Sequence, residues 1–171
     1  MQESVSLTGV LRGLNVSPED GDAYWFTNNR MTILARAAQT GGAFGLVEGI
    51  GPVGSSPPLH VHTREDEVMV LLEGSLLVRC GDETFRAEAG SATFLPRGVA
   101  HTFLVEGDQP ARLLSLSLPG GFEEYFAVAG RPAEGDGLPP NEPPDVAMLA
   151  RVGAEFGLEI VGPPLLPGEA D

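Results

Sequence analysis

The three histidines of this chain, His60, His62 and His101, all fall within two short segments whose spacing could build a metal site. The first segment reads Gly54, five residues, His60, one residue, His62, four residues, Glu67, six residues and Gly74. The second reads Gly90, five residues, Pro96, one residue, Gly98, two residues and His101. Neutral imidazole nitrogens and carboxylate oxygens bind divalent transition metals. Because alternate residues of a β-strand point the same way, His60 and His62 can bind one ion.

Four side chains are the predicted ligands: the imidazoles of His60, His62 and His101 and the carboxylate of Glu67. An octahedral ion held by four donors keeps two positions for water, substrate or dioxygen, as a catalytic site requires. A closed structural zinc site often uses thiolates, but the only cysteine, Cys80, lies outside both segments. The sequence therefore predicts one catalytic divalent transition metal ion per chain.

Each of these residues also has a simpler interpretation. Taken alone, His101 is typical of a half-buried histidine and Glu67 of a solvated acid. Those interpretations weaken because both spaced segments occur together and the chain has no other histidine. We prefer Glu67 to Asp66 as a ligand because Glu67 is the first residue of the predicted apolar strand and lies on the strand face that is expected to point into the barrel. An alternative stays open, in which the histidines alone bind the metal and Glu67 acts as a base or as a hydrogen-bond acceptor beside it.

Short β-rich runs separated by glycine or proline occupy the chain from about 31 to 118, and these must position the ligands. The predicted strands are 31–37, 43–48, 58–62, 67–73, 75–80, 83–87, 91–95, 100–106 and 111–118. Their number and spacing, without a long helix between them, favour an all-β sandwich or jelly-roll barrel. Gly81-Asp82 predicts a two-residue hairpin turn. From a length of 171 residues we expect one domain over 1–171, with its barrel core at about 31–118.

The strand-like pattern of short β-rich runs ends before residue 119, and two helical segments and a proline-rich tail are predicted over 119–171. Apolar residues recur at helical spacing over 121–129 and again over 146–156. Asp145 favours the start of the second helix and Gly157 its end. We expect both helices to pack on the outside of the barrel. The proline-rich residues 162–167 are expected to lie extended on the surface without regular structure.

The strand predicted at 67–73 is apolar on both faces. Met69 and Leu71 share the inward face with the glutamate ligand of this strand, and Phe103 and Val105 share the face of the last histidine. The metal should therefore lie in a dry, apolar cavity, which strengthens metal and proton chemistry. A strand that is apolar on both sides is covered on both sides, either by the second sheet and a helix or by another subunit, and of these we favour a homodimer.

The formal net charge is −14, from 24 acidic residues and 10 basic residues that are all arginines. This charge repels phosphate backbones and anionic lipids, so we expect neither nucleic acid nor a membrane as a partner. A Schiff-base lysine is excluded because the sequence has no lysine. A single cysteine forms no intramolecular disulfide, and residues 1–16 show neither a leader pattern nor an anchor, which favours a cytoplasmic location.

The two histidine segments resemble the two signature motifs of the cupin superfamily. Every motif position is met except the last, where Val105 stands in place of the asparagine of the family, which is not a metal ligand there. Six further segments resemble the small single-domain cupins grouped with quercetin 2,3-dioxygenase: Tyr24-Trp25-Phe26, Gly41-Gly42-Ala43-Phe44, Pro57-Pro58-Leu59-His60, Asp66-Glu67, Gly121-Phe122-Glu123-Glu124-Tyr125-Phe126 and Gly162-Pro163-Pro164. The resemblance implies a cupin jelly-roll β-barrel, also called a double-stranded β-helix, with a C-terminal helical extension.

The same resemblance implies an activity, the oxidative ring opening of a flavonol-like enol by a metal-dependent dioxygenase. In such an enzyme Glu67, besides binding the metal, would take the proton of the substrate hydroxyl. The small-molecule substrate would then contact an apolar set of residues: Phe44, Met69, Leu71, Phe103 and Val105. Ligand type alone does not choose among iron, manganese, nickel, cobalt, copper and zinc. Two alternatives stay open: a metal-dependent isomerase or cyclase that works without dioxygen, and a non-catalytic ligand-binding protein.

Overall fold

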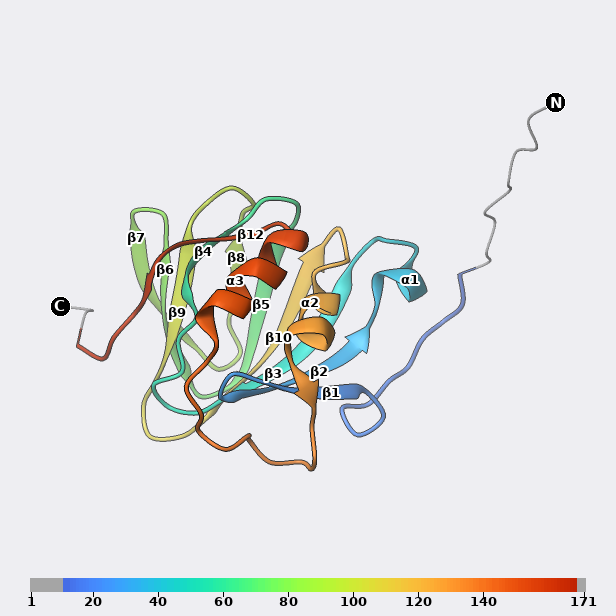
Figure 1. Ribbon diagram of the computed structural model, residues 1–171, viewed down its shortest axis with the longest axis horizontal. Helices are drawn as coiled ribbons and strands as arrows, with labels where there is room; N and C mark the ends of the chain where they lie inside the picture. The colour runs from blue at the N-terminus through green and yellow to red at the C-terminus, as the bar shows by residue number, and fades with distance from the viewer. Residues whose placement is uncertain (1–10, 169–171) are drawn as a thin grey trace.

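Two antiparallel β-sheets face each other in the computed structural model, which describes residues 11–168 (Figure 1). The larger sheet contains, in spatial order, β11 (Arg131–Pro132), β1 (Asp22–Phe26), β2 (Asn29–Ala35), β3 (Gly45–Gly51), β10 (Ala111–Leu118), β5 (Asp66–Glu73) and β8 (Ala92–Leu95). The smaller sheet contains β12 (Leu158–Pro164), β4 (Pro58–His62), β9 (His101–Glu106), β6 (Ser75–Cys80) and β7 (Glu83–Glu88). The predicted jelly-roll barrel is confirmed.

The strands predicted between 31 and 118 correspond to β2 through β10, and their ends differ by at most three residues. The hairpin turn is also confirmed, because Gly81 has φ +58° and the flanking Cys80 and Glu83 pair with each other. The sequence did not predict the strands β1 and β11, nor the short helix α1 (Ala37–Thr40).

The proline-rich end of the chain forms a strand, so the expectation that residues 162–167 lack regular structure is wrong for the first three of them. In β12, Ile160 lies opposite His60 and Pro164 lies opposite Pro58, with a shift in register between the two pairs. Proline cannot donate a hydrogen bond to a neighbouring strand, but β12 is at the edge of its sheet, where this is tolerated. The tail therefore covers the strand that carries two of the predicted ligands.

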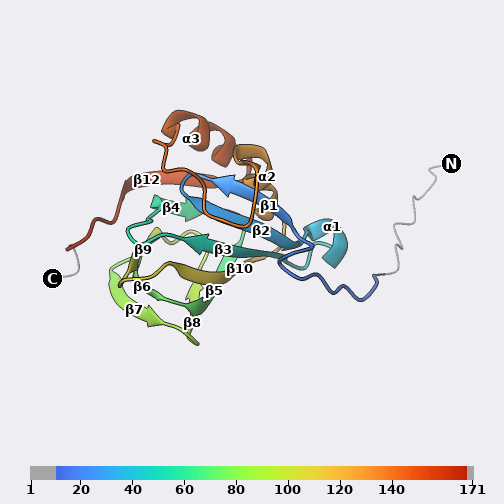
Figure 2. The same cartoon turned by 90° about the horizontal axis from the view of Figure 1, so that it is seen from below.

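The two predicted helices are present as α2 (Glu123–Ala129) and α3 (Val146–Glu155). The Asp145 side chain caps α3 by accepting a hydrogen bond from the backbone N–H of Met148 at 2.9 Å. Gly157, just after the helix, has φ +82°. The helices are joined by the hydroxyl of Tyr125, which donates to the carbonyl oxygen of Leu149 at 3.1 Å. They lie together on one side of the barrel, with α3 beside β12 (Figure 2).

The main core lies between the two sheets and is apolar, with β5 supplying part of its centre. Its buried members are Met69, Leu71, Leu76, Val78, Ala87, Leu95, Val105, Ala111 and Leu113. On the outer face of β5, Val68 and Val70 are only half-buried, and Val68 pairs with Phe94, which is 60% exposed. The homodimer expected from this apolar outer face stays a prediction, which sedimentation at micromolar concentration can test.

Within residues 11–168, no helix combines the length and the apolar character needed to cross a membrane. The expectation about a leader or an anchor concerned residues 1–16, of which 1–10 lie outside the described residues.

Candidate metal centre

The four predicted ligands converge between the two sheets. His60 and His62 come from β4, His101 from the start of β9, and Glu67 from β5 in the facing sheet. His60 lies directly opposite His101 in the pairing of β4 with β9. Each residue offers one nitrogen or oxygen atom, and these four atoms all lie within 4.8 Å of one another. The barrel thus brings together residues that the sequence places in two separate segments.

The three imidazole rings crowd around one carboxylate oxygen. The ring centroid of His60 lies 5.1 Å from that of His62 and 4.5 Å from that of His101. The Oε2 atom of Glu67 lies 3.3 Å from His101 Nε2 and 3.8 Å from His62 Nε2. All three histidines are buried. Because little water reaches these groups, electrostatic interactions among them are strong.

The second ring nitrogen of two histidines is held by a backbone carbonyl. His60 Nδ1 lies 2.7 Å from the oxygen of Pro58, and His101 Nδ1 lies 3.0 Å from the oxygen of Val99. A carbonyl oxygen can only accept, so both imidazoles carry a proton on Nδ1 and donate it there. Each neutral ring then keeps an electron pair on Nε2, the atom that is left to bind a metal.

Glu65 is a member of the site that the sequence analysis missed. Its Oε1 accepts a hydrogen bond from His62 Nδ1 at 2.6 Å, and the two side chains are only 5% and 3% exposed. A carboxylate in this position fixes the orientation of the imidazole and makes its other nitrogen a better ligand. The available signal was an acid three residues after His62. The run Glu65-Asp66-Glu67 does not itself reveal which acids turn inward.

Both oxygens of the Glu67 carboxylate have defined surroundings. The Ser115 hydroxyl, on β10, donates to Oε1 at 2.6 Å, while Oε2 faces the histidines. Burial by itself would raise the pKa of this carboxyl, but the interaction with His101 and the positive charge that His62 can carry lower the pKa to about 2. Glu67 is therefore ionised at neutral pH. Ser115 was not predicted because it lies 48 residues away from Glu67 in the sequence.

Burial lowers the pKa of His60 to about 3, and the positive charges that His101 and His62 can carry act in the same direction. The contact with Pro58 and the charge of Glu67 oppose this shift without reversing it. His60 is consequently neutral at physiological pH. Neutral imidazole is the form that binds metal ions.

This donor set fits a divalent transition metal ion. The Nε2 atom of His101 is buried and, among the described residues, has no hydrogen-bond partner. In the neutral ring with its proton on Nδ1, this nitrogen and Glu67 Oε2 are two electron-pair donors at 3.3 Å, which repel each other unless a proton or a metal ion lies between them. Three nitrogens and one oxygen suit iron, manganese, cobalt, nickel, copper or zinc.

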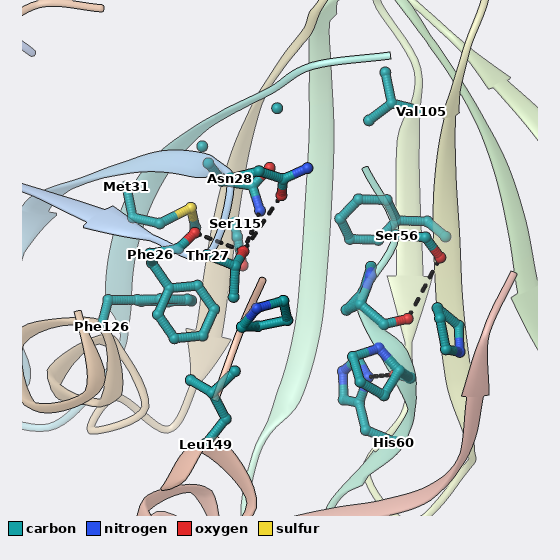
Figure 3. A pocket seen from close by; sticks show the side chains of 18 of the residues that line it. Phe26, Thr27, Asn28, Met31, Ser56, His60, Val105, Ser115, Phe126 and Leu149 are labelled. Atoms are coloured by element: carbon teal, nitrogen blue, oxygen red, sulfur yellow. Dashed lines mark hydrogen bonds between the residues drawn. The ribbon is translucent and has the colours of Figure 1, made fainter. Parts of the chain in front are cut away.

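A cavity of about 490 Å³ adjoins the four residues, within the range typical of small-molecule sites. Figure 3 shows Phe26, Phe126 and Leu149 on one side of it and His60 and Val105 on the other. The sequence left open whether the aromatic residues 24–26 line a cavity or only pack. Phe26 does both, because it lines the cavity and its ring packs against Phe126 with the centroids 5.1 Å apart.

Three of the five residues predicted to contact substrate line this cavity: Met69, Phe103 and Val105. Leu71 and Phe44 are not among the residues that line it, and the substrate contacts of all five residues stay predictions. Leu71 faces inward but lies deeper along β5, packed within the main core. The backbone of Phe44, just before β3, packs against Gly120. Strand parity gives the direction of a side chain and does not show how far a cavity extends.

The C-terminal helices supply a wall of the cavity that was not predicted. Phe122, Tyr125 and Phe126 contribute from α2 and the residue before it, and Leu149 contributes from α3. The ring of Phe122 also packs edge-on against His62, with the centroids 4.3 Å apart. Helical spacing located these apolar faces in the sequence, but it did not show which surface they cover.

Comparison with known proteins identifies relatives of this arrangement. The family model described as "Cupin domain" matches residues 47–117. Quercetin 2,3-dioxygenase of Bacillus subtilis is 27% identical over 128 residues, which are 75% of this chain and 38% of that protein. Tetracenomycin polyketide synthase protein TcmJ of Streptomyces glaucescens is 39% identical over 75 residues, 44% of this chain and 49% of that protein. The matched regions span 38 to 59% of the length of the curated relatives.

Solved structures agree on the fold. A predicted oxalate decarboxylase from Thermotoga maritima superposes with a TM-score of 0.57 and 21% identity, covering 62% of this chain and 99% of that one. The polyketide cyclase RemF from Streptomyces resistomycificus superposes with a TM-score of 0.54 and 23% identity, covering 68% and 94%. Residues 47–117 therefore match the cupin domain model, and the chain has the jelly-roll fold of its solved neighbours and resembles small cupins of the quercetinase-like group.

Proposed function

We propose that this cupin is a metal-dependent dioxygenase that acts on a small aromatic or enolic compound of the flavonol type. The observation that carries the proposal is a set of three histidines and one glutamate whose donor atoms lie within 4.8 Å of one another, beside an apolar cavity of about 490 Å³. The similarity to quercetin 2,3-dioxygenase of Bacillus subtilis points to the same reaction type. We further propose that the whole chain is a single cupin domain.

In this proposal His60, His62, Glu67 and His101 hold one divalent transition metal ion. When bound, the ion supplies a Lewis-acid centre that makes a coordinated enol or phenol hydroxyl more acidic and leaves room for dioxygen beside it. Glu65 keeps the ring of His62 in the orientation that binding requires.

The proton of the substrate hydroxyl passes to Oε2 of Glu67. Ser115 holds the other oxygen of this carboxylate at 2.6 Å, so that Oε2 stays turned toward the centre. A carboxylate beside a cation is a weak base, and the proton transfer therefore needs a hydroxyl that is already acidified. Dioxygen is the oxidant, and both of its oxygen atoms enter the product. The apolar walls formed by Phe26, Met31 and Phe103 exclude water from the activated substrate.

Oxygen consumption tests this function. Purified protein loaded in turn with iron, manganese, cobalt, nickel or copper is supplied with flavonols in an oxygen electrode. We expect uptake with at least one metal and a loss of at least a hundredfold in Glu67→Gln, in line with the usual weight of general base catalysis. Glu73→Gln is the matched control, because Glu73 lies on the same strand but pairs with Arg112 at 3.0 Å on the surface. Uptake that never exceeds that of Glu67→Gln, with any metal, argues against a dioxygenase.

A second candidate function is a metal-dependent cyclase or isomerase. The 39% identity to TcmJ and the fold shared with the polyketide cyclase RemF favour it, because a polyketide-derived aromatic compound would suit the same apolar cavity. Here the metal would act as a Lewis acid and dioxygen would not be consumed. Turnover of a polycyclic aromatic precursor under strict anaerobiosis would support the cyclase, and a strict need for oxygen would exclude it.

A further inference from the structure

We propose that the turn between β1 and β2 forms a hydrogen-bond-donating subsite that binds a neutral oxygen atom, a hydroxyl or carbonyl, at the far end of an oxygenated aromatic ligand. The subsite consists of Thr27 and Asn28, supported by Asn29 and Ser55. The inference rests on the proposed function in one respect only, namely that the other end of the same ligand lies at the metal centre.

The position of the turn is the first argument. Thr27 and Asn28 line the same cavity as the four predicted metal ligands. Figure 3 shows both residues on the side of the cavity away from His60, with the ring of Phe26 near them. A rigid, flat molecule that fills the cavity would therefore meet the metal centre at one end and this polar turn at the other.

The backbone of Thr27 is the second argument. It has φ +55°, and among the described residues it is the only non-glycine with a positive φ. A β-branched residue is strained in this region, where glycine or asparagine fits better. Its side chain is held by donating to the carbonyl of Phe26 at 2.6 Å and by accepting from Asn29 Nδ2 at 3.1 Å. Strain that the surroundings enforce in this way is a feature of binding sites.

The third argument is the difference between the two asparagines. Both ends of the Asn29 amide have a partner, because its Nδ2 donates to Thr27 and its Oδ1 accepts from the buried Ser55 hydroxyl at 2.8 Å. The Oδ1 of Asn28 lies 3.3 Å from the Thr27 hydroxyl and 3.2 Å from the Ser55 hydroxyl, and it shares the single proton of each with a nearer acceptor, Phe26 O and Asn29 Oδ1 respectively. Its Nδ2, which carries two N–H donors, has no partner within the described part of the chain and points into the cavity in Figure 3.

The charge of the surroundings selects a neutral ligand atom. Glu142 also lines the cavity, and the whole chain carries a net charge of −14, so an anionic group is repelled. An uncharged oxygen can accept from Asn28 without that cost. The subsite therefore favours hydroxylated or carbonyl-bearing aromatic compounds over bare aromatic rings and over small carboxylates.

The test compares two ligands by equilibrium binding to zinc-loaded protein, in which no redox turnover occurs. Quercetin carries hydroxyl groups on its outer rings, whereas the parent compound 3-hydroxyflavone carries only the enol. We expect wild-type protein to bind quercetin more tightly. Asn28→Leu should weaken quercetin binding about three- to tenfold, the usual weight of one neutral hydrogen bond, and leave 3-hydroxyflavone binding within about twofold. Asn28→Ala serves as a second variant and should show the same selective loss.

Asn15→Leu is the matched control, because Asn15 is exposed and lies outside the cavity. Zinc content and thermal melting confirm that each variant is folded and loaded. The subsite is refuted if both ligands weaken equally in both Asn28 variants, if neither weakens, or if wild-type protein binds neither ligand. If no oxygen is consumed with any flavonol but the Asn28-dependent preference persists, the dioxygenase proposal fails and the subsite stands.

Discussion

Replacing Glu65 by glutamine should weaken metal binding, because it removes the negative charge behind His62 while nearly keeping the size of the side chain. The wild-type pair is joined by a 2.6 Å hydrogen bond, and both side chains are at most 5% exposed. Partners that orient a metal-binding histidine are usually worth about ten- to a hundredfold in metal affinity. This corresponds to about 1.4 to 2.8 kcal/mol. Since no water can replace the lost charge in so buried a position, we expect a result in the upper half of this range.

The measurement is a competition titration of zinc between the protein and a chelator of known affinity, at pH 7.5. Asp66→Asn is the control, because Asp66 is the next residue and pairs with Arg97 at 2.9 Å on the surface, without a contact to the histidines. We expect its zinc affinity to stay within about twofold of wild type, as is usual for exposed ion pairs. If Glu65→Gln melts like wild type and also binds zinc within twofold of wild type, then the carboxylate does not support His62 and the reasoning is wrong.

Two further predictions concern stability. In metal-free protein the folded-state pKa of His60 is about 3, whereas in the unfolded chain His60 takes up a proton below about pH 6.5. The free energy of unfolding should therefore decrease as the pH is lowered from about 6.5 to about 3. At pH 5 the expected loss relative to pH 7.5 is about 2 kcal/mol. Urea unfolding that gives equal free energies at pH 7.5 and 5 would contradict the assignment for His60. Glu67, with a folded pKa of about 2, adds a loss of stability in the same direction only below about pH 4.5. Gly45→Ala should lower stability by about 1 to 3 kcal/mol, because the new Cβ would lie 1.9 Å from the carboxylate of buried Glu123. Gly13→Ala, which meets nothing within 4 Å, should melt like wild type, and equal melting of the two variants would refute the packing argument.

The four donors were predictable because each one obeys a local rule. His60 and His62 are two apart in a strand, and Glu67 begins the alternation that continues through Met69. His101 follows a Pro-x-Gly turn that starts the next strand of the motif. Strand alternation and turn chemistry act over a few residues, so the sequence alone was enough to give the strands β2 to β10 and the inward face of each candidate ligand.

Contacts between distant segments were not predictable in this way. Ser115 reaches Glu67 only because β10 and β5 are neighbours in the sheet. The proline-rich strand β12 forms because β4 offers it an unpaired edge, and local propensity opposes it. The depth of the cavity, which includes Phe103 and leaves out Leu71, depends on where the two sheets and the helices close together.

The sequence by itself therefore determined the strands β2 to β10, the two C-terminal helices and the candidate ligands, since these follow from periodicity and spacing along the chain. Only the tertiary structure decided that Glu65 supports His62, that α2 and α3 wall the cavity, and that Asn28 faces it. The physical reason is that burial and hydrogen-bond partners depend on which segments meet in space. That outcome is set by the packing of the whole fold and is not encoded in any single stretch of residues.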